Sequence, residues 1–375
     1  MIRSLRPMIV KEFRQIRRDP TSLGMLLVLP AALIVIVGYA LNFDVRHVPL
    51  AIYDQDRTAA SRAYLEKFKH TEYFDYRYDV DRYSTIEELF LNGHATIAVV
   101  VPPRFGDDLA AGRTVTVQIL LDGSDANSAG QAMANASRLT VDYSTRLVAA
   151  ELRRQGAGVY LPVEFRPRIW YNPDLQTSKF LIPGLIGFIL VLTAVVSTSL
   201  TVVREKERGT MEQLMVSPLR PLHMIIGKTV PYLVISLGAA TAILIIGFLL
   251  FDVVVEGSLV VLYAGIITII LGALGQGLLI STVTDSQQVA FMISVFSSLL
   301  PSFLLSGFVF PISSMPIVLQ VLSNVAVNKF FLVVVRGVML RGVGFEALWP
   351  QFVYMAIFAI VMLGVSVRRM RKRSL

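Results

Sequence analysis

The tripeptide Gly227-Lys228-Thr229 is the segment of this sequence that comes closest to a catalytic signature. A phosphate-binding loop needs the pattern G-x-x-x-x-G-K-[ST], in which backbone N–H groups wrap the phosphates of a nucleotide. The first glycine is missing, because position 222 is Leu, and the tripeptide leads into an apolar stretch rather than following a strand. We therefore predict no nucleotide site there and expect the Lys228 ammonium to extend to lipid headgroups.

The other residue types that carry out chemistry are absent or badly spaced. The chain has no cysteine, which excludes disulfides, thiol catalysis and zinc held by cysteine. The four histidines lack the spacing of metal ligands; they are His47, His70, His94 and His223. The sequence thus predicts no catalytic residue, no metal site and no cofactor bound by this chain.

The first charged segment, Leu5–Arg18, has the pattern of an amphipathic helix. Such a helix lies in the membrane interface with its basic face toward anionic headgroups, and Asp19-Pro20 ends it. The apolar arc holds Leu5, Met8, Ile9, Phe13 and Ile16, and the basic arc holds Arg6, Lys11, Arg14, Arg17 and Arg18.

Glu12 is the exception in this pattern, because the helical wheel places it within the apolar arc. A carboxylate there is costly unless it is paired. Two interpretations stay open. Glu12 pairs with a basic residue of the connection Arg204–Lys228, or its side chain reaches water at the edge of the helix.

The second charged segment, Arg204–Pro218, carries charges of both signs where an apolar stretch ends. Thr210 can cap a short helix whose first turn contains Glu212 and Gln213, and Pro218 ends that helix. A short exposed helix at this place is either a solvated loop or a docking element for a cytoplasmic partner.

The elements around these segments are apolar runs that are long enough to cross a bilayer. A membrane-spanning helix needs roughly 20 mostly apolar residues, and only 17% of this chain is charged, against about 25% in soluble domains. One run is interrupted by Pro301, which neighbouring helices can accommodate. We predict an α-helical polytopic membrane protein with six transmembrane helices, at residues 21–41, 178–203, 223–251, 258–284, 288–310 and 346–367.

Basic residues gather in three of the segments outside these helices, and lysine and arginine favour the cytoplasmic side. The segments are an interfacial helix at residues 1–20, the connection at residues 204–222 and a basic tail at residues 368–375. We therefore expect both termini in the cytoplasm. Residues 311–345, which Pro311 and Pro316 interrupt, are expected to form a re-entrant hairpin on the outer side.

Residues 42–177 differ in charge and in periodicity from the rest. They hold 15 Lys/Arg and 18 Asp/Glu, a net charge of −3. Because the whole chain has a net charge of +8, the other residues together carry +11. This distribution argues against nucleic acid as a partner. We predict an extracytoplasmic α/β domain inserted between transmembrane helices 1 and 2, with strands at Val48–Tyr53, Tyr73–Val80, Thr96–Val101, Val115–Leu121 and Val163–Trp170.

A family resemblance rests on these segments. The stretch Arg204–Lys228 reads R-E-x-E-x-G-T-x-E-x-L-x-x-S-P with a trailing G-K, and it resembles the signature of ABC-2 type transporter permeases. Lys11–Pro20 resembles the interfacial helix of that family, and Leu305–Pro316 resembles its outer hairpin. Asp122–Asn127 and Trp170–Pro173 are similar to the large-ectodomain subgroup of bacterial drug-efflux-type permeases. The resemblance spans nearly the whole chain in the expected order.

The resemblance implies a permease of the bacterial inner membrane that pairs with a second permease, identical or paralogous, and contacts membrane lipids. Two cytoplasmic ATP-binding subunits would bind ATP and Mg, and a periplasmic adaptor of the membrane-fusion type often works alongside. A coupling helix around Thr210–Ser217 would rest in a groove of the ATPase, beside the interfacial helix. His223 departs from the family, because many relatives carry an acidic residue there. The implied coupling residues are Arg204, Glu205, Glu207, Gly209, Thr210, Glu212, Gln213, Ser217 and Pro218; those of the interfacial helix are Lys11, Glu12, Arg14, Arg17 and Arg18.

The function expected from the resemblance is export of an amphipathic or drug-like substrate. No substrate-binding residue can be assigned, although Phe188, Phe291, Phe296 and Phe303 are candidates for an apolar lining or for ordinary packing. One rival is an ion-coupled secondary transporter, which needs ionisable residues at the membrane midplane, and none is predicted there. Another is a membrane-anchored extracytoplasmic binding or assembly factor, which needs fewer than six spans.

Overall fold

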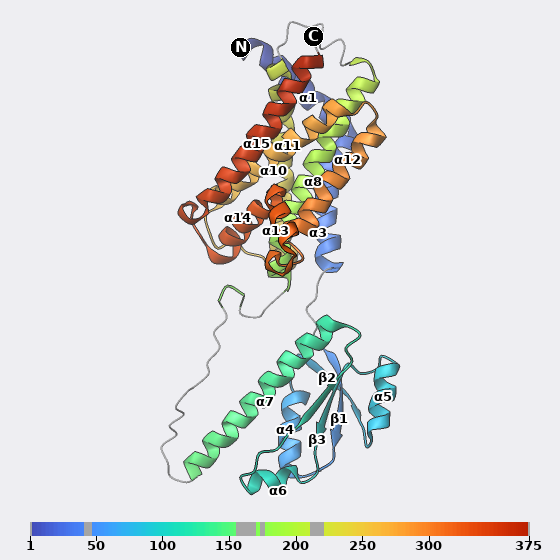
Figure 1. Ribbon diagram of the computed structural model, residues 1–375, viewed down its shortest axis with the longest axis vertical. Coiled ribbons are helices and arrows are strands. Elements are labelled where there is room, and N and C mark those ends of the chain that lie inside the picture. Colours follow the sequence, from blue (N-terminus) through green and yellow to red (C-terminus); the bar gives the residue numbers. More distant parts are fainter. Residues whose placement is uncertain (1, 41–46, 155–169, 173–176, 211–220, 374–375) are drawn as a thin grey trace. The chain divides into compact units, whose positions relative to one another are not determined.

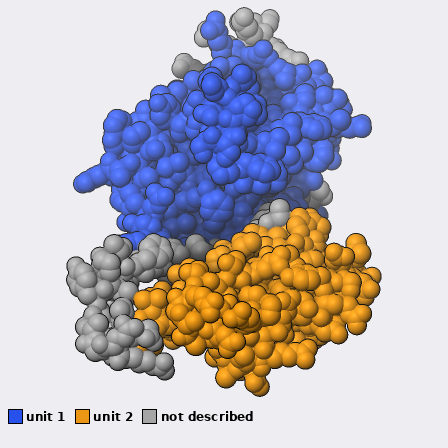
Figure 2. Space-filling model, turned by 60° about the horizontal axis from the view of Figure 1, so that its bottom comes forward, with its two compact units in different colours: residues 1–42, 168–375 blue, residues 43–167 orange. Residues whose placement is uncertain are grey.

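The computed structural model describes residues 2–40, 47–154, 170–172, 177–210 and 221–373. The chain forms two compact units (Figure 2), of which the first comprises Met1–Asn42 and Arg168–Leu375 and the second comprises Phe43–Pro167. The first unit is built of helices, and the second unit contains a sheet (Figure 1). Each unit is described separately below.

The helices of the first unit surround one central helix, α8 (Thr177–Glu207). Within the most apolar 18 residues of α8, 89% are buried, against 22–50% in the corresponding stretches of the four other long helices. Small residues allow this close packing, since a Cβ at Gly277 of α11 would lie 2.6 Å from the carbonyl oxygen of Val195 in α8. The others are α1 (Ile2–Arg18), α2 (Pro20–Leu23), α3 (Leu29–Ala40), α10 (Pro221–Phe251), α11 (Leu259–Val283), α12 (Gln287–Leu300), α13 (Ile317–Leu322), α14 (Val327–Arg341) and α15 (Phe345–Arg373).

Five helices of the described residues are long and apolar enough to cross a membrane, and they fall where the second to sixth spans are predicted. The first predicted span, residues 21–41, is less regular. It contains a π-helical segment, η1 (Gly24–Val28), ahead of α3, and the apolar helix Gly24–Ala40 is shorter than the other five. Five helices, rather than six, therefore meet the length of a span on their own.

The segment after α12 also departs from the prediction. α12 continues into a second π-helical segment, η2 (Pro301–Leu305), but the helix ends there and not at residue 310. Gly307 adopts a positive φ of 81°, which ends a right-handed helix. Within the predicted hairpin at residues 311–345, the helices Ile317–Val325 and Val327–Arg341 meet at a bend of 83°.

The second unit is built on a four-stranded sheet with the order β2-β1-β3-β4 (Figure 1). β1 pairs with β2 and β3 in parallel, and β3 pairs with β4 antiparallel. The predicted strand at residues 115–121 begins only at Gln118, and of the predicted strand at residues 163–170 only Trp170 is described, outside any strand. The strands are β1 (Val48–Asp54), β2 (Phe74–Asp79), β3 (Ile97–Val101) and β4 (Gln118–Leu121).

Helices cover both faces of this sheet. The alternation of β1 sends Leu50 and Ile52 into a cluster with side chains of α4 (Ala59–Lys69) and of α7 (Ala126–Arg154). Ala51, on the other face, packs in a cluster with α5 (Tyr83–Leu91). A short helix, α6 (Phe105–Ala110), follows β3. Two-sided burial explains why β3 is apolar at every position.

Candidate functional site

The site is built where α1, the end of α8 and the start of α10 meet. α1 is amphipathic as predicted, with Met8 and Ile16 buried and the side chains of Arg14, Arg17 and Arg18 exposed. It can approach α10 closely because position 227 is glycine: a Cβ there would lie 2.7 Å from the Cγ of Met8. This contact brings the polar residue on the apolar arc of α1, Glu12, against α10.

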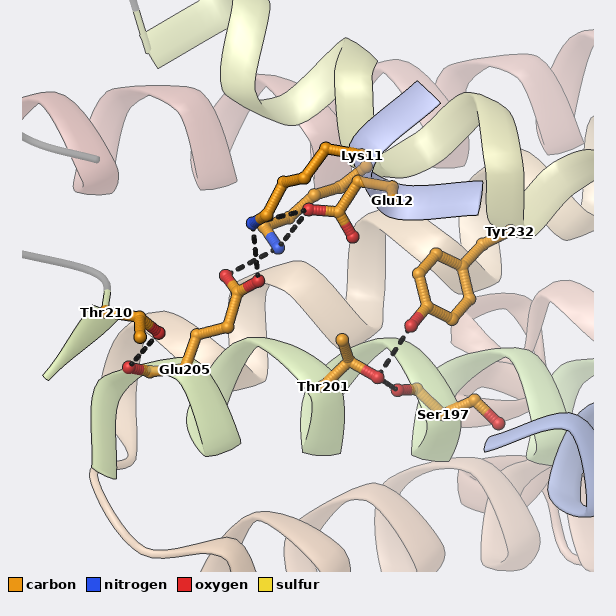
Figure 3. Close-up of polar contacts among 8 residues, drawn as sticks. Lys11, Glu12, Ser197, Thr201, Glu205, Thr210 and Tyr232 are labelled. Atoms are coloured by element: carbon orange, nitrogen blue, oxygen red, sulfur yellow. Dashed lines mark hydrogen bonds and ion pairs between the residues drawn. The ribbon is translucent and has the colours of Figure 1, made fainter. Parts of the chain in front are cut away.

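Four charged side chains form an ion cluster at this junction: Lys11, Glu12, Glu205 and Lys228 (Figure 3). The Lys228 Nζ lies 3.1 Å from Glu12 Oε1 and 2.7 Å from Glu205 Oε2. The Lys11 Nζ lies 3.2 Å from Glu205 Oε1 and 3.4 Å from Glu12 Oε1. The four formal charges cancel, and each Lys contacts both Glu.

The burial of this ion cluster resolves two sequence predictions. Glu12, Lys228 and Glu205 are 0%, 1% and 4% exposed. Glu12 therefore pairs with a basic residue of the connection, Lys228, and does not reach water. The expectation that Lys228 extends to lipid headgroups is wrong, because two carboxylates hold its ammonium inside the protein. The tripeptide around Lys228 lies within the continuous helix α10, so its backbone N–H groups do not form a phosphate-binding loop.

Buried charges stabilise a fold only when their geometry compensates the loss of water. In the ion cluster, both carboxylate oxygens of Glu205 and Oε1 of Glu12 lie within ion-pair distance of an ammonium group. Glu12 Oε2 has no hydrogen-bond partner among the described residues. One turn of α8 before Glu205, the Tyr232 hydroxyl of α10 donates to the Thr201 hydroxyl at 2.7 Å (Figure 3). α8 and α10 are thus joined by two buried polar contacts on adjacent helical turns.

The residues beside Glu205 contact further elements. Arg204 donates to Asp19, between α1 and α2, and to the Gln287 side chain at the start of α12. Glu207 accepts from the backbone N–H of Gln287 at 2.7 Å. Lys206, which sequence reasoning did not single out, donates to the carbonyls of Ser281 and Thr284 at the end of α11. The charged end of α8, Arg204–Glu207, therefore bonds to α1, α10, α11 and α12.

This arrangement assigns different places to the predicted coupling residues. Glu205 lies inside the protein and Glu207 lies at the surface, two residues apart on one helix. Gly209 adopts a positive φ of 69°, as a residue just past a helix end commonly does, and the Thr210 hydroxyl donates to the Glu205 carbonyl at 3.1 Å. Glu212, Gln213, Ser217 and Pro218 lie outside the described residues, and so does most of the predicted coupling helix.

The remaining candidates for chemistry find other roles. The described residues contain no group of three or more His, Asp or Glu side chains that could hold a metal. Phe188 stacks on the buried Phe308, and Phe303 contacts Phe308 edge-on, so both have a packing role. Phe291 and Phe296, in contrast, are exposed on α12. The arrangement offers a mechanical connection between helices rather than a reaction centre.

Comparison with known proteins identifies the family of this chain. Residues 20–368 match the model of the ABC-2 family transporter proteins. The probable multidrug ABC transporter permease YbhR of Escherichia coli (strain K12) is 31% identical over 360 residues, which cover 95% of this chain and 96% of that protein. The probable multidrug ABC transporter permease YbhS of the same organism is 28% identical over 373 residues, covering 99% and 97%. The inner membrane transport permease YhhJ is 26% identical over 333 residues, covering 86% and 85%. With a match over nearly its whole length, this chain belongs to the ABC-2 family of transporter proteins, as a membrane permease subunit that works with a separate ATPase.

Proposed function

We propose that this permease exports amphipathic or drug-like molecules and that the charged end of α8 transmits the motion of the ATPase to the membrane helices. The observation that carries the proposal is that four consecutive side chains, Arg204–Glu207, bond to four other elements. The substrate class is drawn from the relatives, which are named as probable multidrug permeases.

The proposed transmission follows from the position of α8. It is the most buried long helix of the first unit, and closely packed helices move between discrete arrangements rather than deforming continuously. A displacement of residues 208–218 would act on the charged end of α8. The ion cluster would pass it to α1 and α10, and Lys206 and Glu207 would pass it to α11 and α12.

The proposed topology has six spans. The helical stretch Pro20–Ala40 is about 30 Å long at roughly 1.5 Å per residue, which matches the hydrocarbon core and completes the five longer helices. The distribution of Lys and Arg favours cytoplasmic termini. Residues 43–167 and the bent pair Ile317–Arg341 would then lie on the outer side. The proposed partners are a second permease, two cytoplasmic ATP-binding subunits and a periplasmic adaptor.

Reconstitution with the ATP-binding subunits tests this function. We expect ATP-dependent uptake of a fluorescent amphipathic dye into inverted vesicles, and the substitution Glu212→Arg should lower co-purification of the ATPase by roughly tenfold or more. The matched control is Glu256→Arg, which makes the same charge change in the exposed loop that the topology places outside. This control should leave co-purification unchanged.

Two results would contradict the proposal. Dye uptake driven by a proton or sodium gradient, without any ATPase, would establish a secondary transporter instead. Equal effects of Glu212→Arg and Glu256→Arg would show that residues 208–218 are not the docking element.

A further inference from the structure

A basic hollow of about 630 Å³ opens beside the ion cluster, between α1 and the end of α8. Its lining contains five cationic side chains and one carboxylate, a formal charge of +4. This is a high local density of positive charge for one surface. The lining residues are Lys11, Arg14, Gln15, Arg18, Asp19, Pro20, Arg204 and Arg208.

The internal ion pairs neutralise only part of this charge. Lys11 contacts the carboxylates of the ion cluster, and Arg204 pairs with Asp19. Among the described residues, no carboxylate lies within ion-pair distance of Arg14, Arg18 or Arg208. Within the described part of the chain, three guanidinium groups therefore line one hollow without a carboxylate partner, and guanidinium groups bind phosphate oxygens in pairs of parallel hydrogen bonds.

The surroundings of the hollow indicate which kind of phosphate it takes. The chain passes directly from the hollow, at Pro20, into the apolar segment η1 and α3. Val28 of η1 is 67% exposed and Phe296 of α12 is 58% exposed. Both elements pack on the same buried cluster of α8, η1 through Met25 and α12 through Ala290. Exposed apolar side chains thus lie on two membrane elements that begin close to the hollow, because η1 follows Pro20 and α12 begins at Gln287, which bonds to Arg204 of the lining.

We propose that the basic hollow binds the phosphate headgroup of an anionic phospholipid, whose acyl chains lie along η1 and α12. A soluble phosphate or an acidic protein surface would use the guanidinium groups but not the apolar side chains, whereas an anionic phospholipid would use both. The lipid would connect α1 to the end of α8 from outside, parallel to the ion cluster inside. The proposal rests on the proposed position of α1 at the membrane surface, and it does not require the ATPase.

A single-cysteine reporter tests this binding, because the chain has no cysteine of its own. Gln15→Cys, labelled with a small fluorophore, places the reporter in the lining of the hollow. The purified full chain in neutral detergent is titrated with phosphatidylglycerol, with phosphatidylcholine and with glycerol phosphate. We expect a saturable response to phosphatidylglycerol, and only weak responses to the other two ligands.

A charge-matched pair of variants decides whether the hollow itself is responsible. Arg14→Gln with Arg18→Gln should weaken phosphatidylglycerol binding by about thirtyfold. Arg14→Lys with Arg18→Lys keeps the charge but loses the paired hydrogen bonds of the guanidinium groups, and it should weaken binding by a smaller factor. Arg368→Gln with Arg369→Gln removes the same charge from exposed positions of α15 and should change the affinity less than twofold. Unchanged midpoints of thermal unfolding would show that all variants are folded.

Three outcomes would overturn the proposal. Equal affinity for glycerol phosphate would mean a soluble-anion site. Equal weakening by the Arg368 and Arg369 control would mean diffuse attraction without a site. Loss of ATPase co-purification with intact lipid binding in the Arg14 and Arg18 variant would make the hollow a protein interface. Failure of ATP-driven transport alone would contradict the proposed function and leave this lipid site standing.

Discussion

The two ends of α8 hold buried or half-buried cations in opposite ways. At the charged end, Lys228 lies between two carboxylates. At the other end, Arg336 of α14 donates to the carbonyls of Gly307, Phe180 and Phe308, and its guanidinium carbon lies 3.8 Å from the centre of the Phe180 ring. No ion pair with a carboxylate is found for Arg336 among the described residues.

The charged end thus depends on ion pairs between particular side chains, whereas the Arg336 end depends on hydrogen bonds to backbone carbonyls. An ion pair between named side chains is lost when one partner moves or is replaced, and the other is then left buried and charged. Backbone carbonyls remain whatever the sequence, and each can accept a second hydrogen bond. The ion pairs of the charged end are therefore suited to break or form when a helix moves, whereas the hydrogen bonds of the Arg336 end are suited to hold α8 in place.

The largest effect is expected from Lys228→Met, which leaves the buried carboxylates of Glu12 and Glu205 with the exposed ammonium of Lys11 as their one remaining cation in the ion cluster. Breaking a buried ion pair from one side costs about 3–5 kcal/mol, so the midpoint of thermal unfolding in detergent should fall strongly. The matched control is Lys329→Met in α14, whose ammonium bonds to the uncharged side chains of Ser323 and Asn324. The control should shift the midpoint little.

A neutral replacement of the three buried members of the ion cluster sharpens this result. Lys228→Met combined with Glu12→Gln and Glu205→Gln removes the uncompensated charges, and it should restore at least half of the lost stability. Dye transport should stay impaired in this variant, since the directional contact between α1, α8 and α10 is gone. Full recovery of both stability and transport would show that the ion cluster contributes packing only.

The second prediction compares two glycines, Gly184 near the Arg336 end of α8 and Gly227 near its charged end. A Cβ at Gly184 would lie 2.2 Å from the ring of Phe308, and a Cβ at Gly227 would lie 2.7 Å from the thioether side chain of Met8. Phe308 is fully buried and cannot move, so Gly184→Ala should destabilise by about 1–3 kcal/mol. Met8 is flexible, and alanine is about 0.5–1 kcal/mol better than glycine in a helix.

Gly227→Ala is therefore expected to be nearly neutral in thermal unfolding, while Gly184→Ala lowers the midpoint. Both variants are measured in the same detergent and compared with Gly364→Ala of α15, where an added Cβ meets no atom within 4 Å. A larger loss for Gly227→Ala would mean that α1 is held rigidly against α10.

The third effect tests the end that lacks carboxylates. Arg336→Met removes three hydrogen bonds to carbonyls and the contact with the Phe180 ring, and we expect a loss of about 1–2 kcal/mol. The loss should be smaller than that of Lys228→Met, because no opposite charge is left behind. If Arg336→Met is the more damaging of the two, the distinction between the two ends fails.

Local rules predicted the elements of this protein better than the contacts between them. The helix Leu259–Val283 lies within one residue of the predicted span 258–284 at both ends, because length and hydropathy suffice to place an apolar helix. The first span was predicted as regular, yet it contains the π-helical segment Gly24–Val28. The α8 end was predicted as a set of partner contacts, yet Glu205 lies inside the protein.

The ion cluster shows where sequence reasoning ends. The position of Glu12 in an apolar arc left two interpretations open, and the structure selects the pairing with a cation, Lys228. Which cation depends on the packing of α1 on α10, and the two partners, Glu12 and Lys228, lie 216 residues apart in sequence. The contrast between Glu205 and Glu207 was open to prediction, because side chains two residues apart on a helix point to nearly opposite sides.

The smallest effect concerns Glu207, the exposed carboxylate of the charged end. It accepts from the first backbone N–H of α12 at Gln287, which is the kind of contact that caps a helix start. Glu207→Gln should speed amide hydrogen exchange in the first turn of α12 by roughly two- to tenfold, with little change in the thermal midpoint. Glu205→Gln is the comparison, since the same change two residues earlier should lower the midpoint and leave the α12 amides protected. If the two variants behave alike, the carboxylates of the charged end do not divide into one that holds the ion cluster and one that starts α12.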